Sequence, residues 1–316
     1  MNKHLFHTIL TMVLLFACNG KQNASLEKGG PKLEWAPIDS INLVLPTGLQ
    51  VYHAINVDPN LRAWYVRVDE SLPEIETRVV ASTDHDGIET VSDFAQRLQV
   101  PVVINGGYFR MDLNPAKHVG ILKVDGELIH SATPSVLRGE QRFYLHRAAI
   151  GFHADDQIDI ERVSSHGDSV YSWEMPIENL PGVPGARRDT VHRCAWSYRD
   201  ILGGGPQLIR DGRIDISVNE EVFFGTSIPQ VHPRTAAGIT SSGDLILLIV
   251  DGRQLISRGV DLEELAEILY DLGCQEAINL DGGGSSALVV NGVLLNRPSG
   301  TTTQRQVMSA IAVFAK

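Results

Sequence analysis

The segment "AINLDGGGSSALVVNGVLL", Ala277 to Leu295, carries the strongest fold signal in this 316-residue chain. An apolar run ends in Asn279 and Asp281, three glycines and two serines follow, and a second apolar run turns at Asn-Gly. An Asn-Gly pair between apolar runs is typical of a β-hairpin. Consecutive glycines are costly to order, because each loses more backbone entropy than any other residue. The pattern predicts a buried strand, a glycine turn and a hairpin, and the cost of the turn indicates a function there.

Two other segments follow the same order of apolar run, glycine cluster and hairpin. They are "INGGYF…GILKVDGELI", residues 104–129, and "ILGGGPQLIRDGRI", residues 201–214. "RAAIG" at 147–151 and "RTAAG" at 234–238 form a second similar pair. Two interpretations stay open. Glycine turns are common in β proteins, or a duplicated β unit places its glycine turns around one shared pocket.

Most of the remaining chain alternates short apolar segments with turns, which predicts strands and hairpins. The clearest helix begins after its N-cap Asp261, has Glu264 in a capping box and stops at Gly273. Residues 90–99 predict a shorter helix. Residues 164–200 are proline-rich and without periodicity, which predicts a long surface loop. The fold class that follows is α+β, with largely antiparallel, hairpin-rich sheets, a few packed helices and Gly-rich turns lining one pocket.

Composition and charge limit the function. Apolar residues make up 43% of the chain and charged residues 21%, as in a globular protein with a substantial core. The formal net charge of −11, with no basic cluster, argues against a nucleic-acid partner, because phosphate backbones are held by surplus Lys and Arg. A pocket for a small anion is compatible with this charge.

The N-terminus, residues 1–18, is typical of a bacterial lipoprotein signal. Lys3 precedes an apolar stretch that is about five residues too short to span a bilayer, and "LFAC" ends at Cys18. We expect Cys18 to be lipidated, with cleavage by ordinary signal peptidase as the alternative. This predicts a lipid-anchored protein of the bacterial cell envelope, periplasmic or extracellular, that meets the membrane only through its anchor.

The rest of the chain divides into three parts. Residues 19–37 are polar and predict a flexible tether, residues 38–84 a small β-rich segment, and residues 85–316 the candidate catalytic domain. Cys194 and Cys274 are far apart in the sequence and lack metal-type spacing. They could pair or remain two buried thiols, and we favour buried thiols.

Charged and polar side chains follow several predicted buried strands. Asp281 precedes the glycine turn, Asp251 and Arg253 follow "LILLIV", Arg234 begins "RTAAG", and Asn105 ends "VVIN". Such groups are costly to desolvate unless paired, although Asp-Gly is also a common turn pair. Their recurrence beside glycine clusters indicates a site. Nucleotide binding is not predicted, because no helix follows the glycines and no Gly-Lys-Ser/Thr is present.

Four collinear segments resemble the phosphodiester glycosidase family: "RTAAG", "LILLIVDGRQLISRGVDLEELAEIL", "AINLDGGGSSALVVNGVLLNRPS" and "RQVMSAIAVF". "INGGYF" resembles its upstream Asn-x-Gly-aromatic-Phe motif. The likeness is close over residues 230–316, looser over 100–230 and absent before 85. It implies hydrolysis of a sugar C1–O bond with a phosphodiester oxygen as leaving group, in a glycan or glycolipid of the envelope or the extracellular space.

That chemistry suggests roles for the residues singled out above. A phosphate leaving group needs little protonation, so anion binding by Arg side chains and backbone N–H groups should matter more. A carboxylate near the anomeric carbon would stabilise or attack the oxocarbenium-like state. The candidate catalytic residues are Asp281, Asp251 and Arg234, and the candidate substrate-binding residues are Asn105, Gly106, Gly107, Arg253, Gly282, Gly283, Gly284, Ser285 and Ser286.

Two other functions fit the sequence. A non-catalytic carbohydrate-binding lipoprotein would keep the pocket without turnover. An ordinary glycoside hydrolase would need a second carboxylate as acid, and Glu174 is a candidate. We expect no cofactor and no catalytic metal. A structural calcium ion at Asp251 or Asp281 stays open, although no EF-hand-like spacing supports one.

Overall fold

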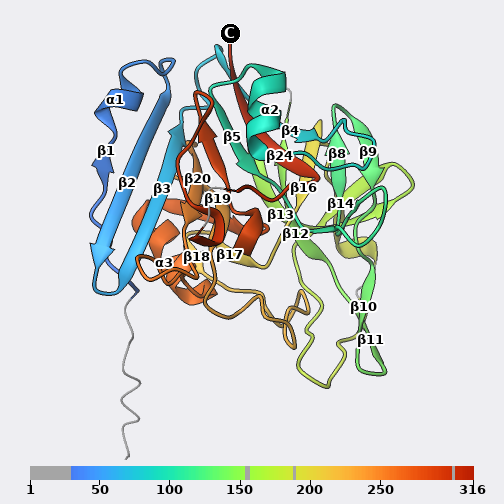
Figure 1. Ribbon diagram of the computed structural model, residues 1–316. Helices are drawn as coiled ribbons and strands as arrows, with labels where there is room; N and C mark the ends of the chain where they lie inside the picture. The colour runs from blue at the N-terminus through green and yellow to red at the C-terminus, as the bar shows by residue number, and fades with distance from the viewer. Residues whose placement is uncertain (1–29, 154–156, 188–189, 301–302) are drawn as a thin grey trace, which may run out of the picture.

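The computed structural model describes residues 30–153, 157–187, 190–300 and 303–316. The predicted signal, Cys18 and most of the tether lie outside these residues. Within them, every strand pairing is antiparallel, which confirms the predicted sheet-dominated α+β class (Figure 1). No helix among the described residues is long and apolar enough to cross a membrane.

Three large sheets form the body of the molecule. In spatial order, the eight-stranded sheet consists of β1 (Ala36–Pro37), β2 (Leu49–Val57), β3 (Asn60–Val68), β20 (Leu245–Val250), β19 (Arg234–Thr240), β21 (Cys274–Asn279), β17 (Gln207–Arg210) and β18 (Arg213–Ile214). The seven-stranded sheet consists of β15 (Arg193–Ala195), β14 (Ser169–Trp173), β13 (Ile158–His166), β12 (Arg147–Phe152), β16 (Asp200–Gly203), β8 (Leu122–Val124) and β9 (Glu127–His130). The five-stranded sheet consists of β23 (Val293–Leu294), β22 (Leu288–Val290), β5 (Val102–Asn105), β24 (Ser309–Ala315) and β4 (Ile75–Ala81).

Smaller elements complete the described structure. The two-stranded sheets pair β10 (Ser135–Arg138) with β11 (Gln141–Tyr144), and β6 (Phe109–Arg110) with β7 (Lys117–His118). The helices are α1 (Asp39–Asn42), α2 (Val91–Leu98) and α3 (Leu262–Asp271), and the short 3-10 helices are η1 (Thr190–His192), η2 (Gly283–Ser285) and η3 (Pro298–Gly300).

Strand β20 explains how the residue pattern creates layers. All six of its side chains are apolar and buried. Alternate residues beginning with Leu245 join a core shared by the large sheets, and those between them, such as Leu248, pack under α3. Because side chains alternate across a strand, a continuous apolar run suits a sheet covered on both faces.

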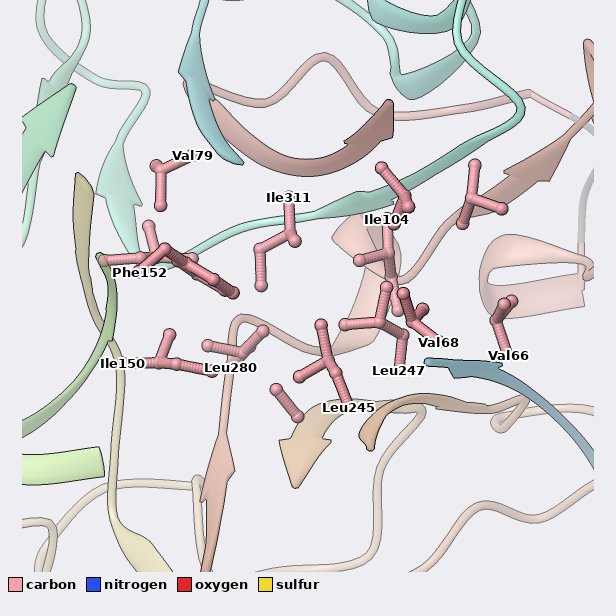
Figure 2. Packing of buried hydrophobic residues seen from close by; sticks show 14 of the residues in the cluster. Val66, Val68, Val79, Ile104, Ile150, Phe152, Leu245, Leu247, Leu280 and Ile311 are labelled. Atoms are coloured by element: carbon pink, nitrogen blue, oxygen red, sulfur yellow. The ribbon is translucent and has the colours of Figure 1, made fainter. Parts of the chain in front are cut away.

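The shared core joins all three large sheets. Leu247 from the eight-stranded sheet, Ile104 from the five-stranded sheet and Phe152 from the seven-stranded sheet point into it (Figure 2). On the far face of the five-stranded sheet, Phe94 of α2 packs against Val103. The three sheets are thus fixed relative to one another by one apolar cluster.

The predicted helices are present. Asp261 caps α3 by accepting a hydrogen bond from the Glu264 amide (2.9 Å), and the Glu264 carboxylate accepts one from the Asp261 amide (3.2 Å). Thr90 and Asp93 form the same capping box on α2. Both helices bury their apolar faces, as amphipathic spacing requires.

The expectation of one long loop over residues 164–200 was wrong. β13 continues to His166, turns at Gly167, which has a φ of 56°, and returns as β14, and β15 then adds to the same sheet. The irregular part is therefore shorter. The hairpin was missed because its strands carry serines at partly buried positions in place of an apolar alternation.

The N-terminal segment extends both neighbouring sheets. β2 and β3 extend the eight-stranded sheet next to β20, and β4 pairs with β24 at the edge of the five-stranded sheet. The last two residues of the predicted tether form β1. Cys194 and Cys274 are both free, and only Cys274 is buried, so the expectation of two buried thiols was wrong for the exposed Cys194.

Candidate active site

The three glycine turns contact one another. They follow β5, β16 and β21, which belong to three different sheets. The Gly205 amide donates a hydrogen bond to the Asn279 carbonyl (2.8 Å), and the Asp281 amide donates one to the Gly106 carbonyl (3.1 Å). These turns, repeated in the sequence, therefore meet at one place, where strand ends from all three sheets converge. That they line one pocket stays a prediction.

Asn105 fixes this meeting point. Its side-chain Nδ2 donates to the Asp281 carbonyl (2.7 Å), and its Oδ1 accepts from the Thr235 hydroxyl (2.8 Å) and the Ala287 amide (3.1 Å). The residue is completely buried. Its side chain thus positions the backbone on both sides of the third turn, from within the protein.

The three glycines after Asp281 have separate packing reasons. A Cβ on Gly282 would lie 2.6 Å from the Pro233 carbonyl oxygen, and one on Gly284 would lie 2.7 Å from an Arg305 guanidinium nitrogen. Gly283 has a φ of 63°, in the left-handed region that favours glycine. The entropic cost of the run is therefore explained by close internal contacts.

Most backbone N–H groups of the glycine turns already have partners. The amide of Gly283 donates to Pro233, and those of Ser285 and Ser286 donate to carbonyls within the turn. The amides of Gly106 and Gly107 both donate to Ser309. At residues 282–286, the Gly284 amide has no partner in the described part of the chain, which leaves it as a candidate anion donor.

The carboxyl group of Asp281 stands at the centre of this arrangement. Burial raises its pKa to about 6, against the opposing effects of the Ser285 hydroxyl, the positive charge of Arg305 and the Gly282 amide. A carboxyl group with such a pKa is ionised at neutral pH yet readily protonated in mild acid. Carboxyl groups perturbed in this way are frequent at functional sites.

Tyr108 lies beside Asp281. Its hydroxyl donates to the Gly205 carbonyl (2.8 Å) and accepts from Asn279 Nδ2 (2.7 Å). Burial raises the pKa of Tyr108, and the charge of Asp281 raises it further. The phenol is therefore neutral and held in place between the first two glycine turns and Asn279.

Arg147 and Arg234, which begin "RAAIG" and "RTAAG", lie near Tyr108, since the charges of both oppose the rise of its pKa. Their guanidinium groups differ in the number of hydrogen bonds that they already make. Arg147 makes one long hydrogen bond, from Nε to the Glu221 carbonyl (3.4 Å), and its guanidinium carbon lies 4.3 Å from the centre of the Phe223 ring. Among the described residues its two terminal nitrogens have no hydrogen-bond partner.

Arg234 is largely committed to the backbone. Its Nε donates to the Val260 carbonyl (3.0 Å), and its Nη2 donates to the carbonyls of Ile228 (2.8 Å) and Gln230. Burial lowers its pKa to about 10. Only Nη1 has no partner in the described part of the chain, so the side chain chiefly holds the loop before β19.

Two further arginines cover the third turn. Arg253 is exposed, its guanidinium lies close to Gly283, and its Nη2 is 3.2 Å from His232 Nδ1. Arg305 Nη1 is 3.4 Å from the Ser285 hydroxyl. Across the described residues, none of the arginines at positions 147, 234, 253 and 305 forms an ion pair with a carboxylate.

Asp251 is placed differently from Asp281. Its buried carboxylate accepts hydrogen bonds from Asn296 Nδ2 (3.0 Å) and from the Arg297 amide (3.1 Å to each oxygen). Burial raises its pKa. This geometry joins two loops, and a catalytic role for Asp251 stays a prediction.

The remaining candidates are placed as follows. Ser285 and Ser286 are both buried. Glu174 is exposed and borders a cavity with Arg162 and Arg210, and none of its described contacts reaches the glycine turns. The described residues contain no group of three or more His, Cys, Asp or Glu side chains arranged to hold a metal ion. The expectations on cofactors and calcium stay predictions.

Comparison with known proteins gives the family. The model of the phosphodiester glycosidase family matches residues 99–314. The chain belongs to the phosphodiester glycosidase family. Among curated relatives, bovine N-acetylglucosamine-1-phosphodiester alpha-N-acetylglucosaminidase is 30% identical over 219 residues, which cover 66% of this chain and 35% of the bovine protein. The mouse protein is 31% identical over 219 residues. The chain thus spans about a third of the length of these relatives.

Solved structures show the same fold. The catalytic domain of zebrafish N-acetylglucosamine-1-phosphodiester alpha-N-acetylglucosaminidase, auto-inhibited by its pro-peptide, has a TM-score of 0.59 and 22% identity, covering 92% of this chain and 85% of that chain. A hypothetical protein from Synechocystis has a TM-score of 0.66 and 18% identity, covering 90% of this chain and 64% of that one.

Three residues at the candidate site were not singled out in the sequence: Tyr108, Arg147 and Glu221. Tyr108 lies within "INGGYF" and Arg147 begins "RAAIG", so the repeated segments already contained the signal. Glu221 has no such signal. It is fully buried, accepts from the Ser217 hydroxyl and from the amides of Ala148 (2.9 Å) and Gln207 (2.8 Å), and burial raises its pKa.

Replacing Asp281 with Asn should stabilise the protein at alkaline pH. The pKa of Asp281 is about 6 in the fold, against 3.8 for the model group, so ionisation costs stability as pH rises from about 4 to 6. Asp281→Asn should therefore exceed the parent in free energy of unfolding at pH 8, by at most about 3 kcal/mol, with a smaller gain at pH 4. Urea denaturation at both pH values measures this, with the exposed Asp39→Asn as control. An equal gain at both pH values would contradict the burial of the charge.

Proposed function

We propose that this protein hydrolyses sugar-1-phosphodiesters, releasing the sugar from a phosphate leaving group. One observation carries the proposal. Arg305 acts on the charge of Asp281, Arg253 lies beside Gly283 and Arg147 lies near Tyr108. None of the three forms an ion pair with a carboxylate among the described residues, in a chain whose net charge is −11. Positive groups left unpaired in an acidic protein favour an anionic ligand. Membership of the phosphodiester glycosidase family supports the same substrate class.

The arginines suit a phosphodiester better than a neutral sugar. The two terminal nitrogens of Arg147 would form a bidentate hydrogen bond with phosphate oxygens, since the described structure gives them no other partner. Arg305 and the Gly284 amide would contact the same group from the third turn. As the C1–O bond breaks, negative charge grows on the leaving phosphate, and these donors would stabilise it.

Asp281 would act as the carboxylate. With a pKa of about 6 it is ionised at neutral pH, so it can stabilise the oxocarbenium-like sugar or attack C1 directly. In the overall reaction water adds its oxygen to C1, the C1–O bond breaks, and a phosphate monoester leaves. Tyr108, held neutral beside Asp281, would orient the sugar by its hydroxyl.

We also propose that the substrate is a glycan or glycolipid of the bacterial envelope, reached by a lipid-anchored enzyme. Residues 1–18 and the cysteine that ends them support this. Expression in a bacterium should yield a mature chain that starts at a lipid-modified Cys18, and mass spectrometry of the N-terminal peptide measures it. A mature N-terminus elsewhere, or an unmodified Cys18, would refute the anchor.

The substrate class can be tested with pairs of substrates that share a sugar and differ in the leaving group. Sugar-1-phosphodiesters should be hydrolysed, and glycosides of the same sugars with neutral leaving groups should not. Asp281→Asn should reduce kcat by at least about a thousandfold. The kcat/KM of the parent should fall as pH drops below about 6, because protonation removes the carboxylate. Hydrolysis of neutral glycosides alone would favour an ordinary glycoside hydrolase, and hydrolysis of neither would favour a binding protein.

Arg147 should contribute to binding the phosphodiester. Loss of charged hydrogen bonds costs about 1.5–3 kcal/mol, so Arg147→Ala should lower kcat/KM by about 10- to 100-fold. Arg147→Lys keeps the charge but not the fork, and should recover part of the loss. The exposed Arg142→Ala is the matched control and should leave kcat/KM unchanged. Parent-like kinetics for Arg147→Ala would exclude a phosphate contact.

A further inference from the structure

A polar cavity lies on the seven-stranded sheet, and its lining contains none of the glycines of the three turns. Its volume is about 230 Å³. β13, β14 and the end of β11 form part of its wall, together with Arg187, Thr190 and Arg193. Its lining includes Thr133, Tyr144, His146, His166, Arg187 and Arg193.

The charge of this cavity is opposite to that of the protein. Arg187, Arg193, His146 and His166 line it, and no Asp or Glu does so among the described residues. The whole chain has 38 acidic residues and 27 Lys or Arg. A cavity whose described lining holds two guanidinium groups and no acid favours an anion in such a chain.

The two arginines are held without being neutralised. The guanidinium carbon of Arg187 lies 4.4 Å from the centre of the Tyr144 ring, and that of Arg193 lies 3.8 Å from the Tyr171 ring. In the described part of the chain, neither guanidinium makes a hydrogen bond or an ion pair. Stacking on a ring face fixes the plane of a guanidinium while leaving its N–H edge free for an oxyanion.

The wall beside these arginines is flat and rigid. The rings of His146 and Trp173 stack with centroids 4.0 Å apart and an interplanar angle of 13°. The Trp173 indole also donates to the Ser164 hydroxyl (2.8 Å). A ligand that reached the two arginines would therefore meet a preformed surface, which lowers the entropy cost of binding.

This cavity adjoins the candidate active site. A small space of about 10 Å³ shares Thr133 with it and is bordered by Arg147 and Gly204. Gly204 belongs to the second glycine turn, and Arg147 is the proposed contact of the scissile phosphate. Arg147 and Gly204 thus border a space next to this cavity, so a leaving group held at Arg147 would lie close to it.

We propose that this cavity binds a second phosphate group, carried by the leaving-group side of the substrate. The natural substrate would then contain at least two phosphates, one at the bond that breaks and one held by Arg187 and Arg193. The identity of the carrier rests on the proposed function. The binding of phosphate in the cavity does not.

Direct binding tests the cavity without turnover. Inorganic phosphate is titrated calorimetrically into the full chain and into the double variant Arg187→Ala/Arg193→Ala. The parent should show a binding event that is at least about tenfold weaker or lost in the double variant, whereas phosphate binding at Arg147 and Arg305 should be the same in both proteins. Arg187→Lys/Arg193→Lys should fall between them, and Arg213→Ala, which lies on the edge strand β18, should match the parent. Superimposable titrations of parent and double variant, with both folded by thermal unfolding, would overturn the proposal.

Steady-state kinetics then tests whether the leaving group of the substrate carries the second phosphate. Two sugar-1-phosphodiesters are compared that differ only in an added phosphate monoester on the leaving group. The double variant should raise KM at least about tenfold for the doubly phosphorylated substrate and leave kcat and KM for the other unchanged. An equal change for both would refute the assignment to the leaving group. If the parent cleaves neither substrate, the proposed function fails, and the phosphate titration still decides whether the cavity is an anion site.

Discussion

The side-chain amide of Asn105 joins the sheets at the point where the candidate site is built. It donates to the carbonyl of Asp281 and accepts from Thr235 and Ala287, so one buried group connects β5, β19 and both sides of the third glycine turn. A buried amide must satisfy its donor and acceptor, and their fixed geometry sets the register of everything bonded to it. This hydrogen bond fixes the backbone of Asp281 and therefore helps to set the position of the Asp281 carboxyl group.

The same constraint explains why glycines cluster where the strands end. Strands from three sheets can converge only if their backbones approach more closely than side chains allow. A Cβ on Gly107 would lie 2.1 Å from the Gly203 carbonyl oxygen, and one on Gly204 would lie 2.7 Å from the Asn279 carbonyl oxygen. Access of a substrate to the backbone is not needed to explain these two positions. The turns are instead the contact surfaces between the sheets, and the functional groups stand beside them.

The arginines at the candidate site and in the cavity place positive charge in a chain whose net charge is negative. Burial lowers the pKa of Arg147, and a buried guanidinium without a carboxylate partner reduces stability. The fold limits this cost by placing Arg147 on the Phe223 ring and Arg187 on the Tyr144 ring, where the charge meets aromatic faces. In the described part of the chain neither arginine forms an ion pair with a carboxylate, although the charge of the buried Glu221 acts on Arg147.

Local pattern in the sequence was sufficient to predict the α+β class, the helix after Asp261 and most of the hairpins. Periodicity, caps and turn residues act over a few positions and can be read without knowing the neighbours. The hairpin at Gly167 was missed because its strands are polar and their pairing gives no local signal. Only the tertiary structure decided that Arg234 is committed to the carbonyls of Val260, Ile228 and Gln230, whereas the terminal nitrogens of Arg147 have no partner among the described residues. The two arginines begin similar segments, and they differ because hydrogen-bond partners are assigned by packing between distant parts of the chain, which no local pattern records.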